Sequence, residues 1–237
     1  MEIVKTNRKR ETSSSGKQQS LSTKALACRR KFLSFFRQGF SDEKYFNWER
    51  GYKWEACEKW RQQLNRTEFY ALLRNKEFLE IANRAVKIES PTNLLFSFEK
   101  MALRDAVRSP EGAKIFATGL FEFLFGPGKI EHRYNHWSRA VSALPKKQSR
   151  VLTHPILTVF PFIAQPEKHI FLKPTVTRRA AENYGFNFIY HSKPSWKTYS
   201  SLLNFAALVK SDLADLKPLD MIDVQSFIWV NGSDEYS

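Results

Sequence analysis

The chain has 237 residues, of which 42% are hydrophobic and 14% aromatic, and its formal net charge is +14. This composition is typical of a soluble globular protein and excludes collagen, a disulfide-dense scaffold and wholesale disorder. The sequence contains no apolar run of membrane-spanning length and no signal peptide, and Cys28 and Cys57 lack the spacing of a zinc site. We therefore expect a cytoplasmic protein with no membrane partner, no bound metal and no cofactor.

Residues 1–22 are rich in Ser, Lys, Arg and Gln and almost free of large apolar side chains. Such a stretch cannot offset its ordering entropy by burial, so we predict a disordered basic arm. Within residues 1–40, ten Lys and Arg stand against two Glu, which suits an arm that follows a phosphate backbone. A solubilising tail without a partner is the alternative. Residues 23–237 are expected to form a single helix-rich globular domain.

A helix is predicted between about residues 45 and 64, because large apolar residues recur there at spacings of three and four. The side that should face the core comprises Tyr45, Trp48, Tyr52, Ala56, Trp60 and Leu64. The same helix carries two Glu–Lys pairs with a spacing of four residues, Glu49 with Lys53 and Glu55 with Lys59. We interpret both as surface ion pairs.

Two Ser–Pro dipeptides, Ser90–Pro91 and Ser109–Pro110, each predict the start of a helix. Ser is a favourable N-cap and Pro suits the first helical position. The helix after the first dipeptide should run from about Thr92 and bury Phe98 and Met101 in the core.

The region 150–192 is expected to contain β structure. Leu157–Phe160 and His169–Leu172 are short apolar runs joined across Gln165–Lys168, where Pro suits a turn, and Phe188–Tyr190 can add a third strand. We therefore predict a mainly α fold with a small β hairpin or short sheet, that is, a compact α+β body after the basic arm.

Three helices should follow, over residues 176–184, about 195–216 and 221–230, and Asp220 can cap the last of them. This C-terminal part is acidic and contains Asp212, Asp215, Asp220 and Asp223. Carboxylates this close in sequence could chelate Mg²⁺ for phosphodiester chemistry. Capping and surface roles account for them without a metal.

A basic patch is predicted from the helix over residues 129–144 into the next loop. At 100° per residue, His132, His136 and Arg139 fall on the solvent side of this helix. A metal site at these histidines is disfavoured because a cation, Arg133, stands between them. The patch suits a polyanion, although an ordinary charged surface is an equal alternative. Besides the two histidines, the predicted basic patch comprises Arg139, Lys146, Lys147 and Arg150.

A second candidate anion site lies at the start of the helix predicted over residues 176–184. Cations there oppose the helix dipole, unless an anion sits between them and the free N–H groups. The residues that would bind it are Lys173, Thr175, Thr177, Arg178 and Arg179. The alternative is that the arginines pair with the acidic C-terminal segment.

Three segments, Tyr45–Trp54, Asn93–Asp105 and Asp220–Val230, resemble those of a bacterial family of uncharacterised proteins. The resemblance implies a bacterial cytosolic setting. It implies no activity, cofactor or residue role.

The charge distribution leads to our functional expectation, which is non-enzymatic binding of nucleic acid through phosphate contacts of the arm and the basic patches. One alternative is a metal-dependent enzyme that acts on nucleic acid. The other is a protein-interaction subunit.

Overall fold

The computed structural model describes residues 21–146 and 151–236. The predicted arm lies outside the described residues except at its end, where Leu21 packs against the core and the Ser22 side chain accepts a hydrogen bond from the Ala25 amide at 3.1 Å. Lys147 and Arg150 of the predicted basic patch also lie outside them. The described part of the chain thus opens on a helix that Ser22 caps.

The described residues form helices and connecting segments and contain no strand, so the predicted β hairpin and α+β class are wrong. The helices are α1 (Thr23–Phe35), α2 (Glu43–Tyr45), α3 (Gly51–Gln63), α4 (Arg66–Arg74), α5 (Phe78–Glu89), α6 (Ser97–Val107), α7 (Pro110–Phe125), α8 (Ile130–Ala143), α9 (His154–Ala164), α10 (Pro174–Tyr184), α11 (Trp196–Asp212) and α12 (Met221–Gly232). A π-helix, Phe46–Arg50, joins α2 to α3, and single 3₁₀ turns occupy Gly39–Ser41, Ala214–Leu216 and Asp234–Tyr236.

The run expected as the first strand belongs to α9. Thr153 caps this helix by accepting a hydrogen bond from the Ile156 amide, and Pro155 stands in its first turn. All residues from His154 to Ile163 are buried, so α9 has no polar face and its sequence shows no helical period. A short apolar run of this kind cannot be told from a buried strand by periodicity. The second run, residues 169–172, is a buried connecting segment without helix or strand.

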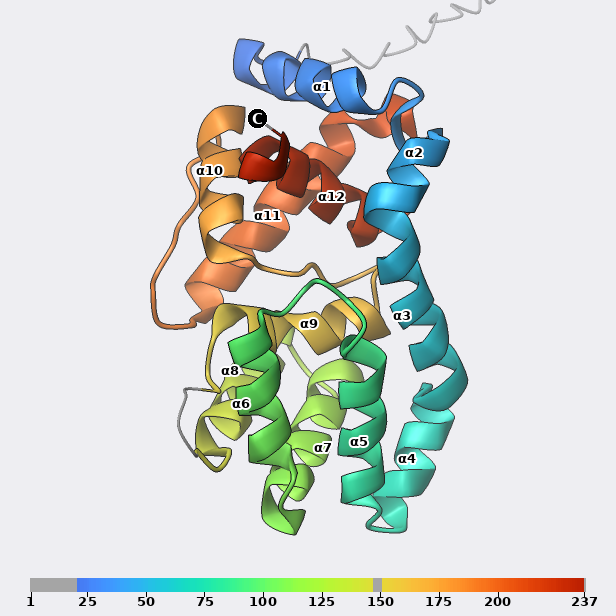
Figure 1. Ribbon diagram of the computed structural model, residues 1–237. Helices are drawn as coiled ribbons and strands as arrows, with labels where there is room; N and C mark the ends of the chain where they lie inside the picture. The colour runs from blue at the N-terminus through green and yellow to red at the C-terminus, as the bar shows by residue number, and fades with distance from the viewer. Residues whose placement is uncertain (1–20, 147–150, 237) are drawn as a thin grey trace, which may run out of the picture.

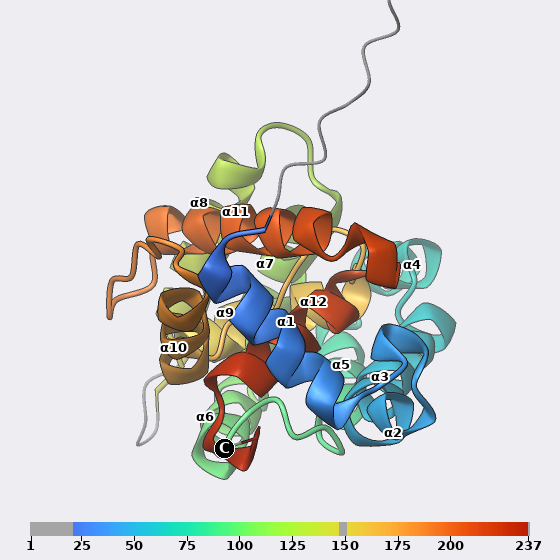
Figure 2. The ribbon, with the colours of Figure 1, turned by 90° about the horizontal axis from the view of Figure 1, so that it is seen from above.

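The helices form two groups that meet at α9 (Figure 1). The upper group contains α1, α10, α11 and α12, and the lower group contains α4 to α8. Seen from above, α1 crosses over α12 (Figure 2). Helix α1 contacts both α12 and α10. The π-helix contacts α12 in the upper group, and α3 contacts α5 and α9 below. The segment from the π-helix through α3 therefore links both groups.

Local sequence signals predict several helix ends correctly. Ser109 caps α7 through the Gly112 amide, Asp220 caps α12 through the Ile222 amide, and Gly185 ends α10 with a left-handed φ of 82°. The prediction at Ser90–Pro91 is wrong, because the next helix, α6, begins only at Ser97. Phe98 and Met101 are exposed instead of buried, because α6 packs through the side that carries Leu103, Ala106 and Val107.

The π-helix changes which residues of this segment face the core. Tyr45, Ala56, Trp60 and Leu64 are buried as predicted, whereas Trp48 is 55% exposed and Tyr52 is half-buried. A π turn holds one residue more than an α turn, so the face that points inward moves by one position. The interpretation of Glu49–Lys53 as a surface pair is therefore wrong, since both side chains are buried.

Candidate functional site

Arg50 of the π-helix forms a buried ion cluster with the start of α12. Its Nη1 lies 2.6 Å from Asp223 Oδ1 and its Nη2 lies 2.8 Å from Asp220 Oδ2. The Tyr45 hydroxyl donates a 2.6 Å hydrogen bond to Asp223 Oδ1. Burial raises the pKa of the Asp223 carboxyl, and the Tyr45 hydrogen bond and the Arg50 charge oppose that shift. These contacts fix α12 against the π-helix.

Lys53 forms a second buried cluster one turn further along. Its ammonium lies 2.9 Å from Glu49 Oε2 and donates a 2.8 Å hydrogen bond to Ser226 Oγ. Glu49 Oε1 accepts a 2.6 Å hydrogen bond from the Tyr236 hydroxyl. Both charges are therefore paired and hydrogen-bonded, which is the condition under which buried ions are tolerated.

The acidic residues that the sequence offers as Mg²⁺ ligands have other partners. Asp220 and Asp223 bind Arg50, Asp215 forms an ion pair with Arg29, and Asp212 accepts a hydrogen bond from Tyr184. Across residues 21–146 and 151–236, no group of three His, Cys, Asp or Glu side chains is arranged to hold a metal ion.

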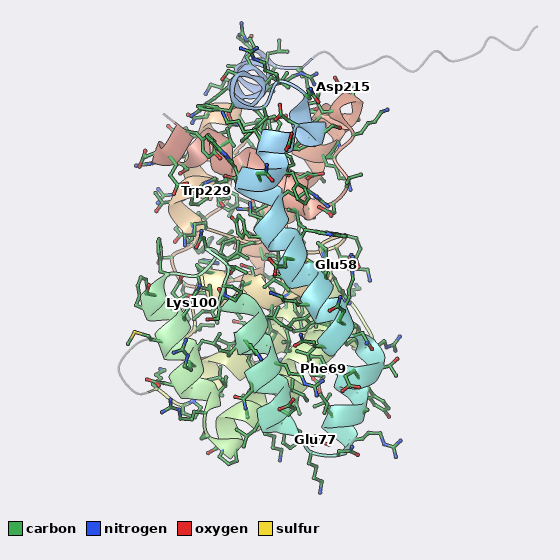
Figure 3. The ribbon with its side chains drawn as sticks, turned by 45° about the vertical axis from the view of Figure 1, so that its right-hand side comes forward. Glu58, Phe69, Glu77, Lys100, Asp215 and Trp229 are labelled. Carbon is green, nitrogen blue, oxygen red and sulfur yellow. The ribbon has the colours of Figure 1, made fainter. Side chains whose placement is uncertain are left out.

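A cavity of about 240 Å³, which we call the central cavity, lies beside the Glu49–Lys53 cluster. Residues of the π-helix, α3, the connection between α5 and α6, the segment before α10, and α12 line it. Two labels in Figure 3 mark the level where the groups meet. Trp229 of the upper group lies above it and Lys100 of the lower group lies below it. The aromatic lining consists of Trp48, Tyr52, Phe96, Phe171 and Trp229. The polar lining consists of Glu49, Asn93, Lys173, Gln225 and Glu235.

Lys173, expected to bind an anion at the start of α10, lines this cavity instead. The residue is 6% exposed, and its ammonium donates a 2.9 Å hydrogen bond to the Leu94 carbonyl. The ammonium also lies 3.3 Å from the ring centroid of Phe96, in a cation–π contact. Burial lowers the pKa of Lys173, and the negative charges of Glu99 and Glu89 oppose that shift.

Gln225 contributes the most unusual atom of the cavity. The residue is 4% exposed, and its Oε1 has no hydrogen-bond partner among the described residues. A buried polar atom without a partner is rare in folded proteins and calls for an explanation. The neighbouring residues on α12, Asp223 and Ser226, are both held by the ion clusters, so the position of Gln225 is well determined.

Three other predicted anion ligands line a separate surface hollow, which we call the α10 groove. Thr175, Arg178 and Arg179 form it together with Glu182, Phe186 and Phe188, and its volume is about 420 Å³. The guanidinium of Arg178 lies 5.1 Å from the ring centroid of Tyr190. Arg179 Nη1 lies 2.8 Å from Asp234 Oδ1, which stands outside the four aspartates of the acidic segment considered above. Thr177 is buried.

The basic patch on α8 is described only in part. His132, His136 and Arg139 are exposed, as the helical period predicts, and so is Lys146 in the loop that follows. His136 Nδ1 lies 2.9 Å from Glu122 Oε2, so one member of the patch faces a carboxylate. The structure thus places Arg139 and Lys146 on the surface and leaves the extent of the patch a prediction.

The cavity residues Trp48, Glu49 and Gln225 were not singled out from the sequence as a site. They come from segments far apart in the chain, and no motif connects them. The one sequence feature connected with this site is the density of charged residues between residues 45 and 64. It did not reveal that a π-helix moves the inward-facing side of this segment by one position.

A scan against protein-family models and searches of curated proteins and of solved structures found no match to this chain. Those searches agree with a weak resemblance to proteins of unknown function. Within the described residues, no helix is both long enough and apolar enough to cross a membrane.

Proposed function

We propose that this protein binds nucleic acid without catalysing a reaction, and that the α10 groove supplies phosphate contacts. The observation that carries the proposal is the convergence of Arg178 and Arg179 with Phe186 and Phe188 around one hollow. Arginine binds phosphate through two parallel N–H groups, and aromatic rings next to it offer surfaces on which bases stack.

The ion pair between Arg179 and Asp234 is compatible with this role. Both partners are well exposed, and exposed pairs of this kind contribute only about 0–1 kcal/mol. A phosphate that brings further contacts can take the place of the carboxylate on Arg179. The Asp234 carboxylate then reduces affinity for anions that make only this one contact.

Helix α1 extends the basic surface toward the N-terminal part of the sequence. Lys24 and Arg30 are exposed on α1 and Arg37 just after it, and residues 1–20 add five Lys and Arg against two Glu. Each cation that pairs with a phosphate releases condensed counterions, so several weak contacts add up to useful affinity at low salt.

The test is fluorescence anisotropy with labelled single-stranded and double-stranded DNA and RNA over a salt series. The double variant Arg178→Gln with Arg179→Gln should weaken binding about tenfold at low salt, and its log–log salt slope should be shallower by roughly 1.5–2. The matched control is Arg104→Gln with Arg108→Gln, which removes the same charge from exposed positions on and just after α6. Equal losses in both double variants would show that only net charge matters and would remove the groove from the proposal.

Deletion of residues 1–20 tests the contribution of the N-terminal sequence separately. The deletion retains Ser22, so the cap of α1 and the melting temperature should be preserved. We expect a shallower salt slope, and an unchanged slope would exclude these residues from binding. Parallel reactions with Mg²⁺ and with EDTA examine the alternative, because Mg²⁺-dependent cleavage of the labelled strand would identify a metal-dependent enzyme.

A further inference from the structure

The outer side of α6 exposes large apolar side chains at its start and arginines at its end. Phe96, Phe98 and Met101 are 54%, 59% and 60% exposed. We propose that this surface binds an acidic amphipathic segment of a protein partner. We call it the α6 stripe, and it comprises Phe96, Phe98, Met101, Arg104 and Arg108. It shares no residue with the α10 groove, so the proposal goes beyond phosphate binding there and does not depend on it.

The helical period places the members of the stripe on one side of α6. Positions 98, 101, 104 and 108 follow one another at spacings of three, three and four residues. At 100° per residue they fall within about 120° of one another, opposite the side that packs through Leu103 and Ala106. At a rise of 1.5 Å per residue, the ten residues span about 15 Å, which is the length of about three turns of a partner helix.

The apolar end of the stripe is a contiguous and well-supported surface. The ring of Phe96 rests on the Lys173 ammonium, 3.3 Å from the ring centroid, and Phe98 stacks on Phe96 at a centroid distance of 5.6 Å. These contacts orient both rings before a partner arrives, which lowers the entropy lost on binding. Met101 lies beside Phe98, three residues on, and its flexible side chain adapts to apolar side chains of different shape. Single exposed apolar residues are ordinary, whereas a contiguous group of them marks an interaction surface.

The charged end of the stripe determines the charge of the partner. Arg104 and Arg108 are exposed, and in the described part of the chain neither has an ion-pair or hydrogen-bond partner. A guanidinium binds a carboxylate through two parallel N–H groups, so the partner should place Asp or Glu opposite the arginines. A second copy of this chain fits poorly, because two molecules with a net charge of +14 repel each other.

The layout of the stripe favours a protein segment over an anionic membrane or a nucleic-acid strand. Both cations lie at one end, and Asp105 stands half-buried next to Arg104, where it repels a surface of uniform negative charge. Met101 has no π surface on which a base could stack, whereas an aliphatic or aromatic side chain packs well against it. An amphipathic helix presents apolar anchors at spacings of three and four and can carry carboxylates one or two turns further on.

The experiment starts from random twelve-residue peptides displayed on phage and selected against the full chain. The selected peptides are then synthesised with a fluorescent label and titrated by anisotropy. We expect them to combine two large apolar residues with Asp or Glu. Phe98→Ala with Met101→Ala should weaken their binding at least tenfold and leave the melting temperature unchanged, since both positions are exposed. Arg104→Gln with Arg108→Gln should weaken it severalfold at low salt and hardly at all at about 1 M salt.

The matched control is Tyr70→Ala with Leu79→Ala, which removes exposed apolar side chains from α4 and α5 and should leave peptide binding unchanged. The groove variant Arg178→Gln with Arg179→Gln should also leave it unchanged, so failure of one proposal is separable from failure of the other.

Phosphatidylserine vesicles and a labelled single-stranded RNA dodecamer examine the two other classes of partner. Phe98→Ala with Met101→Ala should not change binding to either. The inference is overturned if no peptide is selected, if the selected peptides lack acidic residues, or if they bind this variant as tightly as the wild type. It is also overturned if binding of the vesicles or of the RNA depends on Phe98 and Met101.

Discussion

Two Glu–Lys pairs of identical spacing follow one another along the π-helix and α3, yet they lie in opposite environments. The Lys53 side chain of the Glu49–Lys53 pair is 1% exposed, whereas the Lys59 side chain of the Glu55–Lys59 pair is 39% exposed. Their ion-pair distances are nearly the same, 2.9 and 2.7 Å. Spacing therefore predicts that the partners meet, while the register of the helix decides whether water surrounds them.

The environment also decides what each pair is worth. The buried pair has further partners in Ser226 and Tyr236, which satisfy the remaining hydrogen-bonding capacity of its ions. Removal of one buried ion leaves the other without a counter-charge in a medium that solvates it poorly. The exposed pair can replace each lost contact by water.

The largest effect is expected from Lys53→Met, which leaves Glu49 buried without its cation. We expect a loss of about 3–5 kcal/mol in the free energy of unfolding. For a chain of this size, that loss corresponds to a fall of roughly 6–20 °C in melting temperature. Urea denaturation and calorimetry measure both quantities. A loss no larger than that of Lys59→Met would contradict the difference between the two pairs.

A double variant, Glu49→Gln with Lys53→Met, sharpens the same comparison. It removes both charges, and the amide oxygen that replaces the Glu49 carboxylate can still accept the Tyr236 hydrogen bond. Stability should therefore recover by about 1–3 kcal/mol relative to Lys53→Met alone. The four unfolding free energies of a double-mutant cycle give the coupling directly. Additive losses would show that the two buried ions act independently.

The contrast between buried and exposed groups extends to histidine and predicts a pH dependence. His169 is buried, with its Nδ1 3.0 Å from the Tyr199 hydroxyl oxygen, and burial lowers the pKa of its imidazole to about 3. Below pH 6.5 the unfolded chain binds a proton that the folded chain does not, so stability falls as the pH falls. The expected loss is about 2 kcal/mol between roughly pH 6.5 and pH 5.

Denaturation curves at several pH values measure this slope for wild type and two variants. His169→Gln should make it shallower, because His169 no longer takes up a proton on unfolding, and the part that remains belongs to groups such as His154, whose pKa burial also lowers. His136→Gln, at an exposed position beside Glu122, is the control and should not flatten it. If the wild-type slope persists in His169→Gln, another group controls the acid response.

The smallest effect is expected from Lys59→Met. An exposed i,i+4 pair contributes about 0.5 kcal/mol or less, and salt screens that contribution. Urea denaturation at low salt and at about 1 M salt should show a small loss in the first condition and almost none in the second. A loss above about 1 kcal/mol would mean that Lys59 has a role beyond its pair.

Local signals in the sequence predicted those features that local chemistry controls. The caps at Ser109 and Asp220 and the left-handed Gly185 depend on a few neighbouring residues, and the structure confirms them. The sequence also predicted that Arg178 and Arg179 lie at one site, because they are adjacent residues near the start of one helix, and both line the α10 groove.

Features that depend on tertiary burial could not be predicted in this way. Helix α9 is surrounded by other helices, so its sequence lost the polar face that identifies a helix. The central cavity needs Trp48, Lys173 and Gln225 together, and only the folded chain unites them. The turn that exposes Trp48 is a π-helix, for which the sequence carries no comparable marker.

The ion clusters also have a consequence for the order in which the molecule is completed. Arg50 and Asp223 are 173 residues apart, and Lys53 and Ser226 are separated by the same distance in the chain. During synthesis the π-helix and α3 emerge long before α12, so their charged side chains must stay hydrated until the C-terminal helix arrives. Closure of such distant contacts is slow, because loop entropy is lost before the contacts form. The nascent N-terminal part therefore carries an incomplete, hydrated half of the cavity. When α12 packs against it, this helix completes the cavity wall and removes water from the charged groups of Arg50 and Lys53.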